Sequence, residues 1–266
     1  MRRYAPVRSF SEERLWRLCG ELAGRLSCCG MSAKVKVDRG DPKLKALLFD
    51  FGGTLAFLDF ELLAREFSRE GRIVEALALE HAEYAGRAAI DRLLSKAPGK
   101  QADDSAYAHF FRAWMSAAGI GETEIGDCAL RFGAIHKEAT LWRVVRPGTF
   151  EALEAFKSAG YKLAIVSNAE GQVEADAKRF GLAQYFDVII DSHIVGVAKP
   201  DPRIFQIALE RLGVGPDEAR FAGDIYSIDV EGARAAGIEA RLVDQHQRYD
   251  WVEHEKIRHV VELAGV

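Results

Sequence analysis

The stretch at residues 45–55 reads Lys-Ala-Leu-Leu-Phe-Asp-Phe-Gly-Gly-Thr-Leu and decides the fold. Its apolar run, residues 46–49, ends at the carboxylate of Asp50, and two glycines follow one residue later. A short apolar run bounded by glycines predicts a strand that is buried on both faces. A buried charge at the tip of that strand needs partners, and open parallel sheets bind their ligands at strand tips. On this stretch alone, Asp50 either belongs to a ligand site or begins an ordinary turn.

The composition is that of a soluble protein with a substantial core. The chain has 266 residues, of which 48% are hydrophobic and 29% are charged, enough for one large domain or two smaller ones. Its net charge of −4 gives no reason to expect nucleic-acid binding, and no apolar run approaches the roughly 18 residues of a membrane span. The four cysteines form no CxxC pair, so we expect reduced thiols and a cytoplasmic protein.

Residues 1–43 are predicted to be an extension separate from the domain. The first 45 residues carry 11 Lys and Arg against five acids, a net charge of +6, which leaves −10 for the remainder. Ser11 is placed to cap a basic amphipathic helix, and residues 34–42 read as a linker. This helix could contact a membrane surface, act in targeting, or pack on the domain. Alternatively, it precedes a true start at Met31.

Residues 57–145 follow a helical pattern. Apolar residues recur among charges from Leu62 to Leu93, then around Trp114, and residues 122–137 predict a further helix. Strand signals are scarce in this segment. An all-helical block inserted after a single strand predicts a separate layer, a cap or lid.

From residue 146 onward, predicted strands alternate with predicted helices, which is typical of an α/β protein with a parallel sheet and right-handed crossovers. Asp201 is placed to cap a helix that has Pro202 at its first position. The strands are predicted at 162–166, 186–190, 220–222 and 240–243, and the helices at 149–158, 172–180, 202–212 and 228–236.

Polar residues follow the predicted strands at the points where these strands end. In a parallel sheet those ends share one edge, so the groups can converge. Clustered carboxylates repel one another, and a hard cation such as Mg²⁺ would relieve that repulsion. A serine hydroxyl can bind a phosphate oxygen, and a lysine can balance the charge. The residues are Asp50, Ser167, Asn168, Lys199, Asp224 and Asp229.

Four blocks of sequence in this order resemble the haloacid dehalogenase superfamily of hydrolases, most of which are phosphatases. The resemblance covers about residues 45–244. It implies a Rossmann-like parallel sheet with helices on both faces, built from residues 44–56 and 146–266, and a helical cap at residues 57–145. The blocks are Phe49-Asp50-Phe51-Gly52-Gly53-Thr54-Leu55, Ile165-Val166-Ser167-Asn168, Lys199-Pro200-Asp201-Pro202 and Gly223-Asp224-Ile225-Tyr226-Ser227-Ile228-Asp229.

The resemblance also implies roles for individual residues. Asp50 would be the nucleophile that forms an aspartyl-phosphate, and Lys199 would neutralise charge in the transition state. Thr54 would support the loop. Mg²⁺ would be held by Asp50, the Gly52 carbonyl, Asp224 and Asp229, and phosphate by Ser167 and the backbone around Phe51, Gly53 and Asn168.

Gly52 is a departure from the family pattern. Most family phosphatases have a second Asp two residues after the nucleophile, which protonates the leaving group. That help is typically worth about 10²–10⁴-fold. Three explanations compete: a substrate with a good leaving group such as an acyl phosphate, a substitute acid such as Asp59, or weak or lost activity.

The prediction is therefore a capped, Mg²⁺-dependent hydrolase of a small phosphorylated metabolite. The alternatives are a dehalogenase or phosphonate C–P hydrolase of the same fold, and a weakly active or non-catalytic member. The acidic pair Asp224 and Asp229 favours a metal and phosphoryl chemistry. The cap lysines, Lys96, Lys100 and Lys137, lie in no recognisable phosphonatase motif. The sequence sets neither the substrate nor the oligomeric state.

Overall fold

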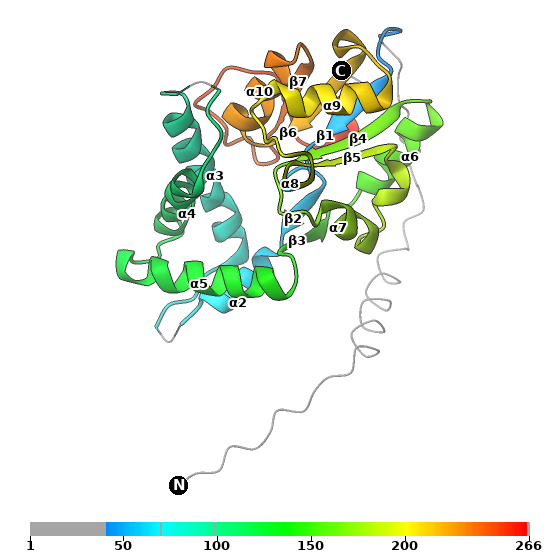
Figure 1. Ribbon diagram of the computed structural model, residues 1–266. Coiled ribbons are helices and arrows are strands. Elements are labelled where there is room, and N and C mark those ends of the chain that lie inside the picture. The colour runs from blue at the N-terminus through cyan, green and yellow to red at the C-terminus, as the bar shows by residue number, and fades with distance from the viewer. Residues whose placement is uncertain (1–40, 70, 98, 265–266) are drawn as a thin grey trace, which may run out of the picture. The chain divides into compact units, whose positions relative to one another are not determined.

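The computed structural model describes residues 41–69, 71–97 and 99–264 (Figure 1). The predicted helix near Ser11 and almost all of its linker lie outside the described residues.

A six-stranded parallel sheet forms the centre of the described chain, in the order β5-β4-β1-β6-β7-β8. This confirms the predicted α/β class with a Rossmann-like parallel sheet. The stretch that decides the fold supplies β1, which lies between β4 and β6, so Asp50 leaves the sheet at its middle. The strands are β1 (Ala46–Phe49), β4 (Lys162–Ser167), β5 (Val188–Asp191), β6 (Ala219–Gly223), β7 (Glu239–Val243) and β8 (Lys256–Ile257).

Alternate residues of β1 enter two different hydrophobic cores. Leu47 and Phe49 pack in the core with α6 and α7, whereas Ala46 and Leu48 pack in the core with α9 and α10. The sheet is thus covered on both faces (Figure 1). Fully burying a Leu or Phe side chain contributes about 1.5–3 kcal/mol, which explains why an unbroken apolar run specifies the central strand. The helices are α6 (Thr149–Ser158), α7 (Val173–Arg179), α9 (Pro202–Leu212) and α10 (Glu231–Ala235).

The start of α9 follows the predicted pattern and fixes the loop before it. The Asp201 carboxylate accepts a hydrogen bond from the Arg203 N–H at 3.0 Å, and Pro202 is the first helical residue. Pro suits this position because its missing N–H would find no partner inside the helix. Lys199 therefore lies on the short segment that leads into this fixed helix start.

Helices fill most of the segment between β1 and α6, but its two ends are strands. The strands β2 (Ala56–Leu58) and β3 (Trp142–Val145) pair in antiparallel fashion, which the sequence analysis did not predict. The helices are α2 (Phe60–Phe67), α3 (Ala76–Leu94), α4 (Asp104–Ala117) and α5 (Glu122–Glu138). They enclose a core of their own around Trp114, whose indole N–H donates to the Leu79 carbonyl at 2.8 Å.

The remaining elements are short. They are α8 (Ser192–Val195), a π-helical turn at Tyr226–Val230, and 3₁₀ turns at Ala183–Tyr185, Pro216–Glu218 and Val260–Ala264. The helix predicted to start near Ile228 thus begins as the π-helical turn, which continues into α10. Within the described part of the chain, no helix is both long enough and apolar enough to cross a bilayer.

Candidate active site

Three buried carboxylates converge at the carboxyl edge of the sheet. One oxygen from each of Asp50, Asp224 and Asp229 lies within 4.8 Å of the others, and the three residues are at most 6% exposed. Asp50 follows β1 and Asp224 follows the neighbouring strand β6, so the parallel pairing brings them together. Asp229 comes from the π-helical turn, where its carboxylate accepts the N–H groups of Asp224 (3.1 Å) and Ile225 (2.9 Å).

Lys199 joins two of these carboxylates. Its Nζ lies 2.5 Å from Asp50 Oδ1 and 2.6 Å from Asp229 Oδ1, and its side chain is buried. Burial lowers the pKa of Lys199, but the charges of Asp229 and Asp50 outweigh burial and raise it overall. Asn168 positions this lysine, because its Oδ1 accepts the Lys199 N–H at 2.8 Å and its Nδ2 donates to the Lys199 carbonyl at 3.0 Å.

A second cation reaches the cluster from the helical segment. The Arg87 guanidinium, on α3, lies 3.1 Å from Asp224 Oδ2 and 3.2 Å from Glu83 Oε2. Both ion pairs are buried, and the guanidinium also lies 4.8 Å from the centre of the Tyr84 ring. Burial lowers the pKa of Arg87, but Glu83 and Asp224 outweigh burial and raise it.

The cluster carries more negative than positive charge. The four carboxylates of Asp50, Asp224, Asp229 and Glu83 face the two cations, Lys199 and Arg87. Burial, reinforced by Asp229 and opposed by Lys199, raises the pKa of Asp50 to about 6. Burial also raises the pKa of Asp224 well above its usual value, with the charges of Asp50 and Asp229 adding to it and Arg87 opposing it.

These residues fit a hard divalent cation. Converging buried carboxylate oxygens are the ligands that Mg²⁺ prefers, and the uncompensated charge of the cluster matches its charge. The buried Thr54 Oγ1, in the loop after Asp50, finds no hydrogen-bond partner among the described residues.

The loop after Asp50 packs directly on the cluster. Gly53 has a φ of +76°, and a Cβ added there would lie 2.2 Å from Asp224 Oδ2. Only glycine permits that approach. The Gly53 N–H donates to the Ala56 carbonyl at 2.8 Å, so this donor is engaged within the loop, and phosphate binding at Gly53 stays a prediction. The Phe51 N–H is engaged as well, because it donates a hydrogen bond to the Asp50 carboxylate.

Ser167 and Asp59 have different surroundings. Ser167 is buried at the last position of β4, next to β1, and its binding of phosphate stays a prediction. Asp59 caps α2 by accepting the Leu62 N–H at 2.9 Å, and its other oxygen accepts two bonds from Arg143 at 2.8 and 3.0 Å. Because both of its oxygens are engaged, Asp59 is a helix cap and not the substitute acid.

Helix α3 contributes buried charged residues that were not predicted from the sequence. Glu83, Arg87 and Asp91 recur every four residues and are all buried. Asp91 accepts the Ser227 N–H at 2.9 Å and the Trp251 indole N–H at 3.0 Å. The four-residue spacing was the available signal, because it places three charges on one face of the helix.

Tyr107, on α4, also reaches the site. Its hydroxyl interacts with the Asn168 side chain and feels the charges of Lys199, Asp229 and Asp50. Burial of the phenol raises its pKa, although 43% of the residue remains exposed. A tyrosine with these contacts is placed to meet a substrate.

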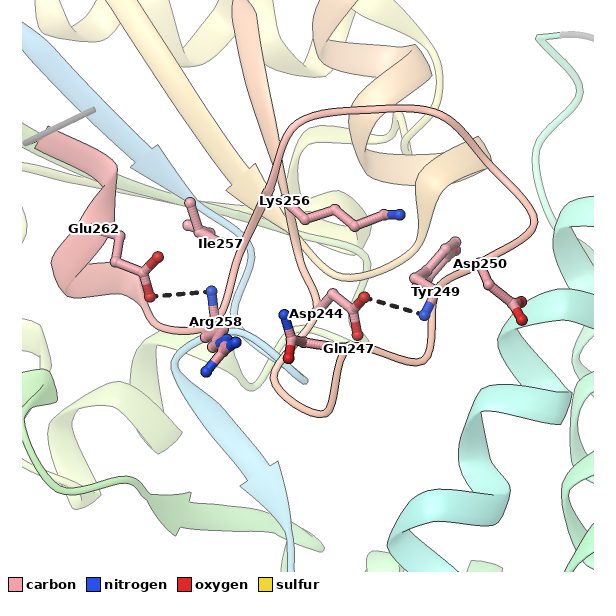
Figure 2. Close-up of a pocket in the computed structure, with 8 residues that line it drawn as sticks. All are labelled: Asp244, Gln247, Tyr249, Asp250, Lys256, Ile257, Arg258 and Glu262. Carbon is pink, nitrogen blue, oxygen red and sulfur yellow. Dashed lines mark hydrogen bonds between the residues drawn. The ribbon is translucent and has the colours of Figure 1, made fainter.

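A separate pocket of about 290 Å³ lies beside the ends of β7 and β8. Figure 2 shows its polar lining, in which Asp244 accepts the Tyr249 N–H and Glu262 accepts the Arg258 N–H, both at 3.1 Å. None of the three clustered carboxylates lines it. This pocket is therefore distinct from the candidate active site.

The fold and the site are those of an α/β protein with a buried acidic centre at the carboxyl edge of its parallel sheet. A family model for haloacid dehalogenase-like hydrolases matches residues 44–237, and the chain belongs to this family.

Similar proteins support this assignment. The chain is 31% identical over 215 residues to a phosphoserine phosphatase from Thermus thermophilus, covering 78% of this chain and 84% of that protein. It is 40% identical over 102 residues to the mouse haloacid dehalogenase-like hydrolase domain-containing protein 3, but this match covers 38% of the chain and only 40% of the mouse protein. A solved structure of a phosphatase from Thermococcus onnurineus has a TM-score of 0.50 at 28% identity, covering 83% of this chain and 96% of that one.

Proposed function

We propose that the protein is a Mg²⁺-dependent phosphatase that hydrolyses a small phosphorylated metabolite through an aspartyl-phosphate on Asp50. The observation that carries this proposal is the buried cluster of Asp50, Asp224 and Asp229 with Lys199 bridging two of its members. The phosphatases similar to this chain support the same reaction class.

In the first step, an oxygen of Asp50 attacks phosphorus and the leaving group departs with the electron pair of its bond. Lys199 orients the Asp50 carboxylate through the 2.5 Å contact and offsets negative charge on the transferring group. Water then attacks phosphorus, and the bond to Asp50 breaks. Bound Mg²⁺ would supply charge neutralisation for the phosphoryl oxygens.

We further propose that residues 57–145 act as a cap over this site. Contacts of this segment with the carboxyl edge of the sheet support the proposal: Arg87 binds Asp224, and the Gln101 side chain donates to the Ala198 carbonyl at 3.2 Å. A cap held in this way excludes water and sets specificity when it closes on a substrate.

The other chemistries of the family lack comparable support. Phosphonate cleavage needs a cap lysine at the reacting centre, whereas Lys96, Lys100 and Lys137 are exposed. Lys100 pairs with Asp103 at 3.2 Å on the surface.

The test is Mg²⁺-dependent release of phosphate from acetyl phosphate and p-nitrophenyl phosphate. We expect turnover that EDTA abolishes and that Asp50→Asn removes. Asp217→Asn, which changes an exposed carboxylate in a 3₁₀ turn, is the matched control and should retain turnover. Chloride release from a haloacid without metal would instead indicate a dehalogenase. Mg²⁺ binding without turnover of any phosphate would indicate a non-catalytic protein.

A further inference from the structure

The space next to Gly52 is filled by a tryptophan. A Cβ added to Gly52 would lie 3.2 Å from two ring carbons of Trp142 and 3.4 Å from a third. Such contacts are tighter than ordinary van der Waals separation between carbons. A side chain at position 52 would therefore press on the indole ring, which would have to give by a few tenths of an ångström, so the glycine and the tryptophan pack as a matched pair.

The indole ring is held on both sides. Trp142 is the first residue of β3 and pairs with Leu58 of β2. Its side chain packs against the core around α6 and α7 and also against the core of the helical segment. The backbone N–H of Trp142 donates to the Thr140 hydroxyl at 3.3 Å, which holds the start of the strand. A ring packed between two cores is a built feature of the site and does not move aside freely.

Two carboxylic acids of residues 57–145 are already engaged in other contacts. Asp59 is engaged by the start of α2 and by Arg143. Glu83 is paired with Arg87 at 3.2 Å. The Tyr107 hydroxyl also reaches the site from the helical segment, and burial raises its pKa, which makes it a weak proton donor.

We infer that Trp142 is a specificity-determining residue that occupies the place of the leaving-group acid, so that the enzyme selects phosphate compounds whose leaving group departs without a proton. This inference rests on the proposed function. The substrate class is that of acyl phosphates and aryl phosphates, whose leaving groups are weakly basic anions.

The chemistry balances without an acid. The bond from phosphorus to the leaving oxygen breaks as the bond from Asp50 to phosphorus forms, and the leaving group departs as a carboxylate or aryloxide. In the second step, water adds to phosphorus, Asp50 is released as a carboxylate, and the proton passes to solvent or to the phosphate product. An acid that has given up its proton would normally serve as the base for this water. Gly52 supplies neither function, so the second step is slow and the phosphorylated enzyme accumulates.

The test is a series of aryl phosphates whose phenols span a wide range of pKa, with kcat/KM measured for each. Because no proton is supplied to the leaving group, we expect kcat/KM to fall by up to about tenfold for each unit of phenol pKa. A burst of phenol release should precede the steady state. A shallow dependence on phenol pKa, or sugar phosphates turned over as well as activated aryl phosphates, would overturn the inference.

Variants of Gly52 and Trp142 test whether the missing acid causes the steep dependence of kcat/KM on phenol pKa. In Gly52→Asp/Trp142→Ala the acid has room, so the dependence should flatten and turnover of alkyl phosphates should rise at least about tenfold, part of the 10²–10⁴-fold that an acid provides. Trp142→Ala alone should keep the steep dependence, because it adds no acid. If Tyr107→Phe makes the dependence steeper, Tyr107 donates the proton and the inference is wrong.

The same series of aryl phosphates distinguishes failure of the phosphatase proposal from failure of the leaving-group inference. If even the most activated aryl phosphate is not hydrolysed in the presence of Mg²⁺, the phosphatase proposal fails before the leaving-group inference is reached. The wild-type series needs no variant, so the inference can be refuted even where the double variant does not fold.

Discussion

Arg87 and a metal ion should compete for the same carboxylate, and Arg87→Met tests this directly. Arg87 is buried, with Asp224 at 3.1 Å and Glu83 at 3.2 Å. Methionine keeps the apolar stem but leaves both carboxylates without their cation. Removing one partner of a buried ion pair costs about 3–5 kcal/mol, and we expect a loss of that size in EDTA.

Mg²⁺ should reduce this loss. A ligand at 100 times its Kd stabilises a protein by about 2.7 kcal/mol, and an ion near Asp224 would take over the charge that Arg87 supplies. We expect the variant to bind Mg²⁺ at least about tenfold more tightly than the wild type, equivalent to about 1.4 kcal/mol. Part of the loss should remain, because Glu83 stays unpaired.

The assay is urea denaturation in EDTA and in saturating Mg²⁺, together with titration calorimetry of Mg²⁺ binding. Arg92→Met is the matched control, since Arg92 is exposed on the same helix and its replacement should have little effect in either buffer. Equal destabilisation of Arg87→Met in both buffers, with unchanged Mg²⁺ affinity, would show that Arg87 and the metal do not share Asp224.

Two further changes test the loop geometry and the electrostatics of the α3 contact. Gly53→Ala should weaken Mg²⁺ binding, measured by calorimetry, because its Cβ would lie 2.2 Å from Asp224, and it should also cost about 1–3 kcal/mol of backbone strain. The control Gly119→Ala has a similar φ of +79° and open space around its Cβ, so it should show only the strain. Equal Mg²⁺ affinity in the two variants would contradict the role of Gly53 in the approach to Asp224. Burial raises the pKa of Glu80, but the hydrogen bond with His246 and neighbouring positive charge outweigh burial and lower the pKa below 4.5. The ionised Glu80 carboxylate therefore stabilises the folded protein above pH 4.5, and this stabilisation is lost as the pH falls through the lowered pKa. The difference in unfolding free energy between wild type and Glu80→Gln should therefore be largest at neutral pH and shrink in acid, and a difference that stays constant with pH would refute this.

The central sheet and the converging polar groups were predictable because local patterns encode them. The apolar run of β1 and the cap formed by Asp201 before Pro202 each follow from a few neighbouring residues. Parallel pairing then brings the strand tips to one edge, so the meeting of Asp50 with Asp224 required only the strand assignments.

The parts that were not predictable depend on contacts between distant segments. The strands β2 and β3 are three and four residues long and are separated by four helices, so no periodicity reveals their pairing. The helical pattern from Leu62 to Leu93 is interrupted after Phe67, where helix α2 ends. Arg69 and Arg72 then form an isolated antiparallel β-bridge, and Gly71 has a φ of +83°.

The charges on α3 were hidden for a related reason. A helix face with mixed charges normally faces water, and only the tertiary structure shows that Arg87 meets Asp224. The relation between Gly52 and Trp142 is likewise invisible in sequence, because the two residues lie 90 positions apart and meet only through β3.

Trapping the phosphorylated enzyme tests the central claim most directly. The protein is mixed with Mg²⁺ and acetyl phosphate, quenched in acid within one turnover, digested, and analysed by mass spectrometry. We expect one added phosphoryl group on the peptide that contains Asp50, and its absence when EDTA is present or when Asp50 is replaced by Asn. A phosphoryl group on any other residue, or phosphate release that survives in Asp50→Asn, would contradict it.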